Sequence, residues 1–254
     1  MTGKPRVIRL KTFGRVDEAT KARVAGLIAK ARNGNWGFWE GRLDRRVEAR
    51  LKELALNPQM QEVRFLDAGA GVGRGVVLAA GIHPKVNAWG LALNPPASGI
   101  YDGKTSIGRH ILPGARELSG RWVEGSFENI VLPDYFDVIQ STFGLQHALN
   151  HTVAIENMLN SLRRGGSLHF TSSQLYPPGR ARNFKQNRLV WEGAFGELEK
   201  QGFEVSRPPE AKLLTGEVAI TRTNLRKADL SAFHGNGVIN LIPLPKREPS
   251  SAAS

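Results

Sequence analysis

The sequence predicts an α/β fold in which helices cover both faces of a mostly parallel sheet. From residue 63 onward, short apolar runs alternate with segments of helical periodicity, the pattern of repeated strand–helix–strand units. The first apolar run ends in a glycine-rich stretch, Asp67 to Gly75, as expected where a strand turns directly into a helix. A length of 254 residues with 41% apolar side chains suits one domain of ordinary size with a small N-terminal addition.

Seven strands and five helices are expected in order. The expected strands are residues 63–66, 86–93, 120–124, 136–140, 167–172, 203–206 and 218–223. The expected helices are residues 17–32, 42–56, 76–80, 154–162 and 189–201. Helix-breaking residues set several ends: Asn57-Pro58 stops the second helix, and Gly202 stops the last one.

These elements divide the chain into three segments. Residues 1–60 form a helical N-terminal segment, residues 61–226 contain the strand–helix repeat, and residues 227–254 form an irregular tail. Because Pro243 to Ser254 is rich in Pro and Ser, we expect the tail to be flexible.

The net charge of +12 lies mainly near the N-terminus. Residues 1–60 hold 14 basic and 6 acidic side chains, whereas residues 61–150 hold 7 and 8. Such a basic arm can attract nucleic acid, anionic lipid or an acidic substrate; a solvated helical face is the alternative. No apolar run approaches the about 20 residues of a membrane span. The absence of cysteine fits a cytoplasmic protein, and the six histidines do not cluster with carboxylates, so no metal site is expected.

The stretch Asp67-x-Gly69-x-Gly71-x-Gly73 is the most informative motif. Glycines let the backbone turn tightly and let a ligand approach without interference from Cβ atoms. The dinucleotide fingerprint Gly-x-Gly-x-x-Gly is absent, because its third position falls on Arg74 or Val76. The motif therefore indicates a nucleotide-type ligand other than a standard dinucleotide.

This motif resembles motif I of class I S-adenosylmethionine-dependent methyltransferases, and the closest pattern is that of small-molecule methyltransferases. Five later segments resemble the family in the same order: Gly90–Pro95, Gly125–Asn129, Leu132–Ile139, Phe143–His147 and Leu162–Leu168. The resemblance implies a Rossmann-like, seven-stranded, mostly parallel sheet with an antiparallel last strand, and S-adenosyl-L-methionine as cofactor. It also implies which residues bind this cofactor: Asp67, Gly69, Gly71, Gly73, Asn94, Ser126, Phe127 and Thr142.

Two positions depart from the family pattern. Ala92 stands where family members carry an acid that accepts hydrogen bonds from both ribose hydroxyls, and Asn94 offers only a neutral acceptor nearby. Ser126 stands where an Asp often binds the adenine amino group. A catalytically silent relative of the family is therefore an open alternative.

An aromatic segment precedes the motif. Trp36, Phe38 and Trp39, next to Gly37, resemble the aromatic lead of tocopherol, sterol and natural-product methyltransferases, which covers the cofactor and shapes the acceptor pocket. A lid of this kind excludes water from an in-line displacement. The alternative is that these side chains only pack the N-terminal helices onto the sheet.

The residues after the fourth expected strand bear on the acceptor. Nucleic-acid amino methyltransferases carry (Asp/Asn)-Pro-Pro-(Tyr/Phe) there, whereas this chain has Ser141-Thr142-Phe143-Gly144, which favours transfer to O or C of a small molecule. His147 is the first candidate general base and His151 the second; lining the cofactor pocket is the alternative role. An RNA or protein methyltransferase using the basic N-terminal arm and a non-catalytic binding subunit stay open. The sequence does not define the oligomeric state.

Overall fold

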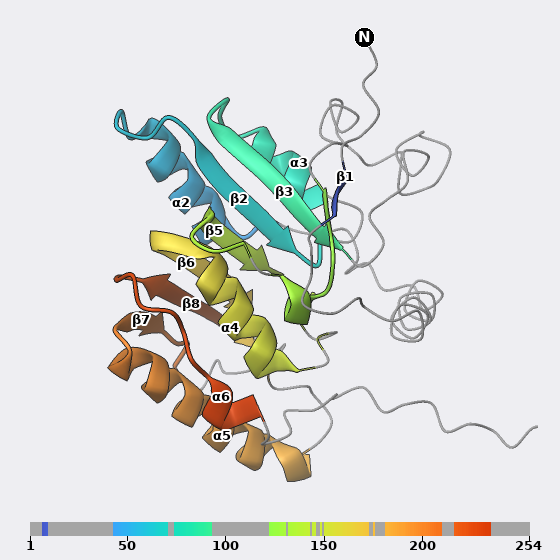
Figure 1. Ribbon diagram of the computed structural model, residues 1–254, viewed down its shortest axis with the longest axis vertical. Helices are drawn as coiled ribbons and strands as arrows, with labels where there is room; N and C mark the ends of the chain where they lie inside the picture. The colour runs from blue at the N-terminus through green and yellow to red at the C-terminus, as the bar shows by residue number, and fades with distance from the viewer. Residues whose placement is uncertain are drawn as a thin grey trace, which may run out of the picture.

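The chain folds around one mixed sheet in the computed structural model (Figure 1). The structure describes residues 7–9, 43–70, 74–92, 122–130, 132–142, 144–145, 148, 150–172, 175, 181–209 and 216–234. In spatial order, the strands are β1 (Val7–Arg9), β4 (Trp122–Glu124), β3 (Val86–Ala92), β2 (Val63–Ala68), β5 (Phe136–Ser141), β6 (Leu162–Thr171), β8 (Glu217–Arg222) and β7 (Phe203–Ser206). Only β8 runs antiparallel to its neighbours, so the prediction of a mostly parallel sheet with an antiparallel last strand is confirmed.

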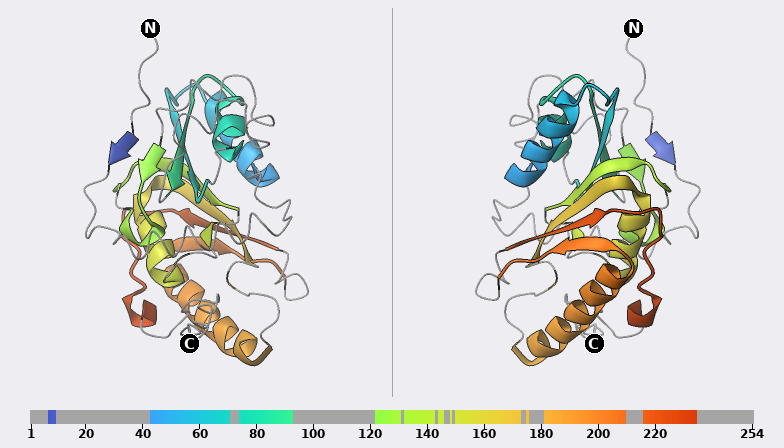
Figure 2. Two further views of the ribbon diagram at one scale, coloured as in Figure 1. Left: turned by 90° about the vertical axis from the view of Figure 1, so that its right-hand side faces the viewer. Right: turned by 90° about the vertical axis from the view of Figure 1, so that its left-hand side faces the viewer.

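Helices lie on both faces of the sheet. Helices α2 (Arg45–Leu56) and α3 (Arg74–Ala80) cover one face, and α4 (His151–Ser161) and α5 (Ala181–Lys200) cover the other (Figure 2). A turn of 3-10 helix, η3 (Phe127–Asn129), follows β4, and the short α6 (Ser231–His234) lies near α4. This three-layer arrangement buries the two sides of the strands in separate apolar clusters.

The smaller cluster joins α2 to the sheet. Val47 and Leu51 of α2 have no exposed surface and belong to the same cluster as Phe65 of β2 and Val138 of β5. Asp44 caps the start of α2 by accepting a hydrogen bond from the backbone N–H of Arg46 (2.7 Å). Helix α2 thus covers one face of the sheet. It begins near the carboxyl ends of the parallel strands, where the backbone N–H of Asp44 donates to Gln140.

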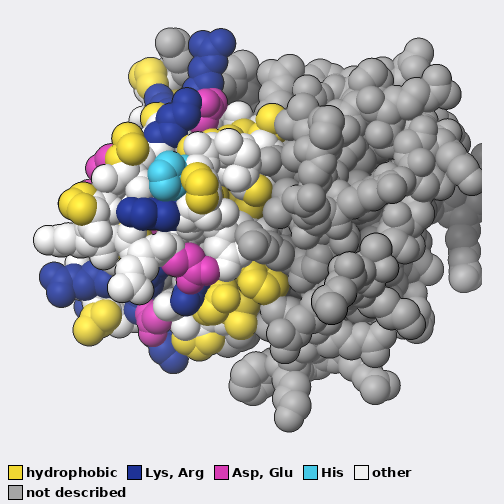
Figure 3. Space-filling model, turned by 90° about the horizontal axis from the view of Figure 1, so that it is seen from above, with side chains coloured by type: hydrophobic (Ala, Val, Ile, Leu, Met, Phe, Trp, Pro, Cys, Tyr) yellow, Lys and Arg dark blue, Asp and Glu magenta, His cyan; other side chains and the backbone are white. Residues whose placement is uncertain are grey.

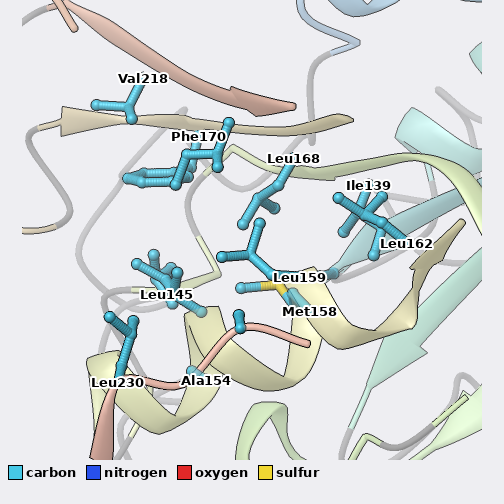
Figure 4. Close-up of a cluster of buried hydrophobic side chains, with 14 of the residues drawn as sticks. Ile139, Leu145, Ala154, Met158, Leu159, Leu162, Leu168, Phe170, Val218 and Leu230 are labelled. Carbon is cyan, nitrogen blue, oxygen red and sulfur yellow. The ribbon is translucent and has the colours of Figure 1, made fainter. Parts of the chain in front are cut away.

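The larger cluster lies under α4 and α5. Met158 and Leu159 of α4 point toward Leu168 and Phe170 of β6, and Leu230 from the C-terminal part of the chain completes the cluster (Figure 4). Large side chains of this kind account for most of the apolar surface that folding removes from water. The alternation of β6 residues between the two faces is what the period of two in a strand requires.

The sheet has eight strands, so the prediction of seven was wrong by one. Strands β2 to β8 correspond to the seven that the sequence predicts. The additional strand β1 lies in the segment predicted to be helical and pairs in parallel with β4, Val7 opposite Trp122. Three residues are too few to show strand periodicity, and the edge of β4 supplies the hydrogen-bonding partner that only the folded sheet provides.

Two other boundaries differ from the prediction. Strand β6 begins at Leu162 rather than 167, because Gly165, with φ +80°, lets residues 163–166 bulge out between two stretches paired with β5. Residues 228–234, predicted as irregular tail, pack onto the domain: Leu230 is fully buried, and Ala228 exchanges two hydrogen bonds with the Asn160 side chain (2.7 and 3.1 Å). Residues 235–254 and the predicted helix 17–32 lie outside the described residues, and the division into three segments stays a prediction. Among the described helices, none is both long and apolar enough to cross a membrane.

Arg222 of β8 provides a test of this packing. Its side chain is 2% exposed and donates to the Asp134 carboxylate (2.6 Å) and to the carbonyl oxygens of Leu162 and Leu225. We expect Arg222→Met to lower the free energy of unfolding by about 2–4 kcal/mol, because buried carbonyl groups lose their donor. Urea unfolding measures this loss. Asp134→Asn is the control: its side chain is 54% exposed, and a loss above about 1 kcal/mol there would contradict this account.

Candidate active site

Several sequence-predicted residues meet at the carboxyl edge of the parallel strands. Asp67 lies near the end of β2, Ser126 and Phe127 follow β4, and Thr142 follows β5. In open α/β sheets this edge is where ligands bind. The structure therefore brings together five of the predicted cofactor-binding residues that it describes, counting Gly69 in the turn after β2.

Asp67 is the buried charge of this edge. This residue is only 3% exposed, and its Oδ1 lies 3.4 Å from Nε2 of Gln140 on the neighbouring strand β5. Burial raises the pKa of Asp67 to about 7, because the ionised form loses its hydration, and the Gln140 hydrogen bond opposes that rise. A buried carboxylate with a neutral partner is a strong acceptor for a ligand cation.

The turn after β2 approaches the turn after β5 very closely. Gly69 has φ +82°, which favours glycine, and a Cβ atom there would lie 2.5 Å from the Cα of Gly144. A Cβ atom on Gly144 would lie 2.6 Å from the carbonyl oxygen of Ala68. Either Cβ would also lie 3.0 Å from the Phe127 ring. The glycine turn of the sequence motif is therefore packed between two loops from other strands.

The loop after β4 is held in place from α4. Asn157 donates to the carbonyl oxygen of Glu128 (2.7 Å), and the backbone N–H of Asn150 donates to the Glu128 carboxylate (3.1 Å). Ser126, which is 8% exposed, precedes this 3-10 turn and makes no capping hydrogen bond with its side chain. The Ser126 hydroxyl therefore does not cap the 3-10 turn. Its contact with the adenine amino group stays a prediction.

The loop after β5 is tied to β6. The carbonyl oxygen of Thr142 accepts a hydrogen bond from the hydroxyl of Thr171 (3.1 Å). His151, the second candidate base, is the first residue of α4 and is fully buried. The first candidate, His147, lies outside the described residues, as do several other predicted site residues: Gly71, Gly73, Asn94, Trp36, Phe38 and Trp39.

Three further residues at this edge were not singled out from the sequence. Gln140 contacts Asp67, Gly144 contacts the glycine turn, and Gly75 lies against the Asp67 carboxylate, where a Cβ atom would be 2.2 Å from Oδ2. A polar Gln directly after the apolar pair Val138-Ile139 was the signal available for the first of them. The two glycines give no comparable signal, because their role depends on how α3 and the loop after β5 pack against the end of β2.

These residues fit the amino-acid part of S-adenosylmethionine. The buried Asp67 carboxylate complements an ammonium group. Gly69 and Gly144 bring the turn after β2 against the loop after β5, and Phe127 offers an apolar ring beside both glycines. The carboxylate and the apolar ring of the described edge are thus suited to a ligand that is cationic and partly apolar.

Comparison with known proteins supports this assignment for the central part of the chain. Residues 66–170 match the family model described as "Methyltransferase domain". No curated protein matches the sequence. The match begins in β2 and ends in β6, so it includes the whole edge built from Asp67, Phe127 and Thr142.

Three similar solved structures differ in how much of this chain they cover. YcgJ from Bacillus subtilis is 19% identical over 50% of this chain and 50% of that chain, with a TM-score of 0.34. CalS10 with bound S-adenosylmethionine, an amino pentose methyltransferase from Micromonospora echinaspora, is 24% identical over 57% of this chain and 55% of that chain (TM-score 0.37). A protein from Corynebacterium glutamicum is 15% identical over 83% and 92% of the two chains (TM-score 0.49). The chain spans about half the length of the first two proteins.

The strand order and the glycine turn at the carboxyl edge define a Rossmann-like α/β protein. Residues 66–170 of this protein match the model of a methyltransferase domain. This match agrees with the family resemblance found in the sequence. S-adenosylmethionine as the cofactor stays a prediction of that resemblance.

The pKa of Asp67 predicts a pH-dependent stability. In the unfolded chain the carboxyl ionises near its ordinary value of 3.8, whereas in the folded protein it does so at about 7. The contribution of Asp67 to the free energy of unfolding therefore falls as the pH rises from about 4 through its folded-state pKa of about 7. Well above that pH the contribution no longer changes. We expect Asp67→Asn to be more stable than the unchanged protein by up to about 4 kcal/mol at pH 8, with the difference vanishing toward pH 4. Urea unfolding at several pH values measures it; a constant difference would contradict the assignment.

The close approach of two turns gives a second prediction. We expect Gly144→Ala to disrupt the edge and weaken binding of S-adenosylhomocysteine at least tenfold, because its Cβ would overlap the backbone of Ala68 and Gly69. Gly196→Ala in α5 is the matched control: no atom lies within 4 Å of its Cβ position, and alanine favours a helix. Calorimetric titration of both variants distinguishes the two sites, and equal affinities would refute the contact.

Proposed function

We propose that the chain transfers the methyl group of S-adenosylmethionine to an oxygen or carbon atom of a small-molecule acceptor. The observation that carries this proposal is the meeting of the buried Asp67 carboxylate with the Gly69–Gly144–Phe127 contact, inside the segment that matches the family. The sequence after β5, Ser141 to Gly144, supports the acceptor class, because it lacks the motif of nucleic-acid amino methyltransferases. A cytoplasmic location remains a prediction from the sequence.

Each residue at the edge has a distinct part in this proposal. The ionised Asp67 binds the methionine amino group. Gly69, which lacks a side chain, lets the turn after β2 pack against Gly144 of the loop after β5. Phe127 provides an apolar surface that excludes water beside the turn. When bound, S-adenosylmethionine would supply an electrophilic methyl group. The acceptor's electron pair would form the new bond as the carbon–sulfur bond breaks, leaving S-adenosylhomocysteine, and the acceptor's proton would pass to solvent. Orientation and exclusion of water are what these residues contribute to that displacement.

The charges of α2 favour a small acceptor over RNA. Three basic side chains of this helix are paired with carboxylates: Arg46 with Glu217 (3.1 Å), Arg50 with Glu53 (2.8 Å) and Lys52 with Glu48 (2.6 Å). Figure 3 shows basic side chains lying among acidic and uncharged ones on the described part of one face. Paired charges of this kind release few counterions on binding a phosphate backbone.

A thermal-shift experiment tests the proposal. At 100 times the dissociation constant, S-adenosylmethionine or S-adenosylhomocysteine should stabilise the protein by about 2.7 kcal/mol, which raises the melting temperature by about 5–10 °C. NAD serves as the control and should give no shift, because the dinucleotide fingerprint is absent.

Two outcomes would redirect the proposal. Absence of any shift with either sulfur compound would overturn the enzyme assignment and favour a non-catalytic binding subunit. Binding of RNA that weakens steeply between 50 and 200 mM salt would favour the nucleic-acid alternative through the basic N-terminal arm.

A further inference from the structure

Gln140 occupies a central position at the edge that the proposed function uses. It lies on β5, is 1% exposed, and stands directly between Asp67 on β2 and His169 on β6 in the register of the parallel strands. Two residues earlier on the same strand, Val138 packs into the cluster beneath α2. The Gln140 side chain therefore lies on the α2 face, where burial of an amide requires that its polar atoms find partners.

The partners of Gln140 fix the orientation of its amide. Its Oε1 accepts a hydrogen bond from the backbone N–H of Asp44 (3.1 Å), which can only donate. The amide cannot be reversed without placing two donors together, so Nε2 faces Asp67 and donates to Oδ1 (3.4 Å). One side chain thus connects the residue that caps α2 with the carboxylate of the proposed cofactor site.

Gly75 confines the same group from the other side. A Cβ atom at this position would lie 2.2 Å from Oδ2 of Asp67 and 3.2 Å from Nε2 of Gln140. The carboxylate is therefore held between the amide and the backbone of α3. Among the described residues, the side chain that orients the carboxylate is Gln140, because Gly75 supplies close packing but no side-chain donor.

We propose that Gln140 is a positioning residue for S-adenosylmethionine, which holds the Asp67 carboxylate in the direction and charge state that bind the methionine amino group. This inference rests on the proposed function. Burial raises the pKa of Asp67, and the hydrogen bond from Gln140 acts against that rise, so the amide favours the ionised form. Binding of a ligand ammonium group requires that form.

Other charged groups near this edge have partners of their own. The Asp44 carboxylate caps α2 through the Arg46 N–H, and the Arg46 side chain pairs with Glu217 (3.1 Å). Glu217 in turn lies 3.5 Å from Nδ1 of His169, the other titratable side chain in the row. The effect of Gln140 on Asp67 is therefore separable from these groups by substitution of His169.

The test compares two ligands that differ at the amino-acid end. S-adenosylhomocysteine carries the methionine-type amino group, whereas 5′-methylthioadenosine lacks it. Titration calorimetry between pH 6 and 8 should show that the unchanged protein binds S-adenosylhomocysteine about tenfold more weakly at pH 6 than at pH 8, as expected for a carboxyl with a pKa of about 7. Ionisation of the ligand's own amino group is common to all variants.

Two variants remove the donor of Gln140. Gln140→Met keeps the length of the side chain, and Gln140→Glu keeps an acceptor for the Asp44 N–H while losing the donor toward Asp67. At pH 7 we expect both to bind S-adenosylhomocysteine about three- to tenfold more weakly, with the pH dependence displaced upward. Binding of 5′-methylthioadenosine should stay within twofold, which also shows that the variants are folded. His169→Gln is the control and should leave the pH dependence unchanged.

Distinct outcomes overturn the inference and the proposed function. Unchanged affinity in the Gln140 variants, or equal loss of both ligands, would reduce Gln140 to a packing residue and overturn the inference alone. A displaced pH dependence in His169→Gln but not in the Gln140 variants would assign the titration to His169. Failure of the unchanged protein to bind either ligand would overturn the proposed function together with the inference.

Discussion

A carboxylate held away from water organises the carboxyl edge of this sheet. Asp67 is almost fully buried, and removing an ionised group from water costs several kcal/mol unless partners replace the lost hydration. Here the described partner is a neutral amide, and a glycine backbone packs against the other oxygen. The folded protein thus carries an unfavourable group at the place where a ligand cation would relieve it, as is common at functional sites.

The rest of the edge depends on how closely three loops can pack around that carboxylate. The turns after β2 and β5 touch at Gly69 and Gly144, and Phe127 from the loop after β4 lies against both. Parallel strands make this possible, because their carboxyl ends all reach the same edge. Hydrogen bonds from α4 hold the third loop at Glu128, so the helix on one face and the turn on the other belong to one packed unit.

The helix that precedes the motif is joined to this unit as well. Helix α2 packs its apolar side against β2 and β5, and its capping residue Asp44 donates to Gln140. At the opposite end of the chain, residues 228–234 close the larger cluster over α4 through Leu230. Segments outside the family match at residues 66–170 therefore contribute directly to the core and to the edge.

The sequence by itself determined the alternation of strands and helices and the place of Asp67 and Gly69, because these depend on local periodicity and on turn residues. The antiparallel final strand was implied by the family resemblance. It missed β1, since a three-residue strand exists only through pairing with the edge of β4. It also gave no sign of why Gly75 and Gly144 must lack side chains or what Gln140 contacts. Gln140 contacts residues 73 and 96 positions away, and Gly144 contacts the turn after β2 about 75 positions away. Only the tertiary structure, which places β5 between β2 and β6 and α2 above them, decided these contacts.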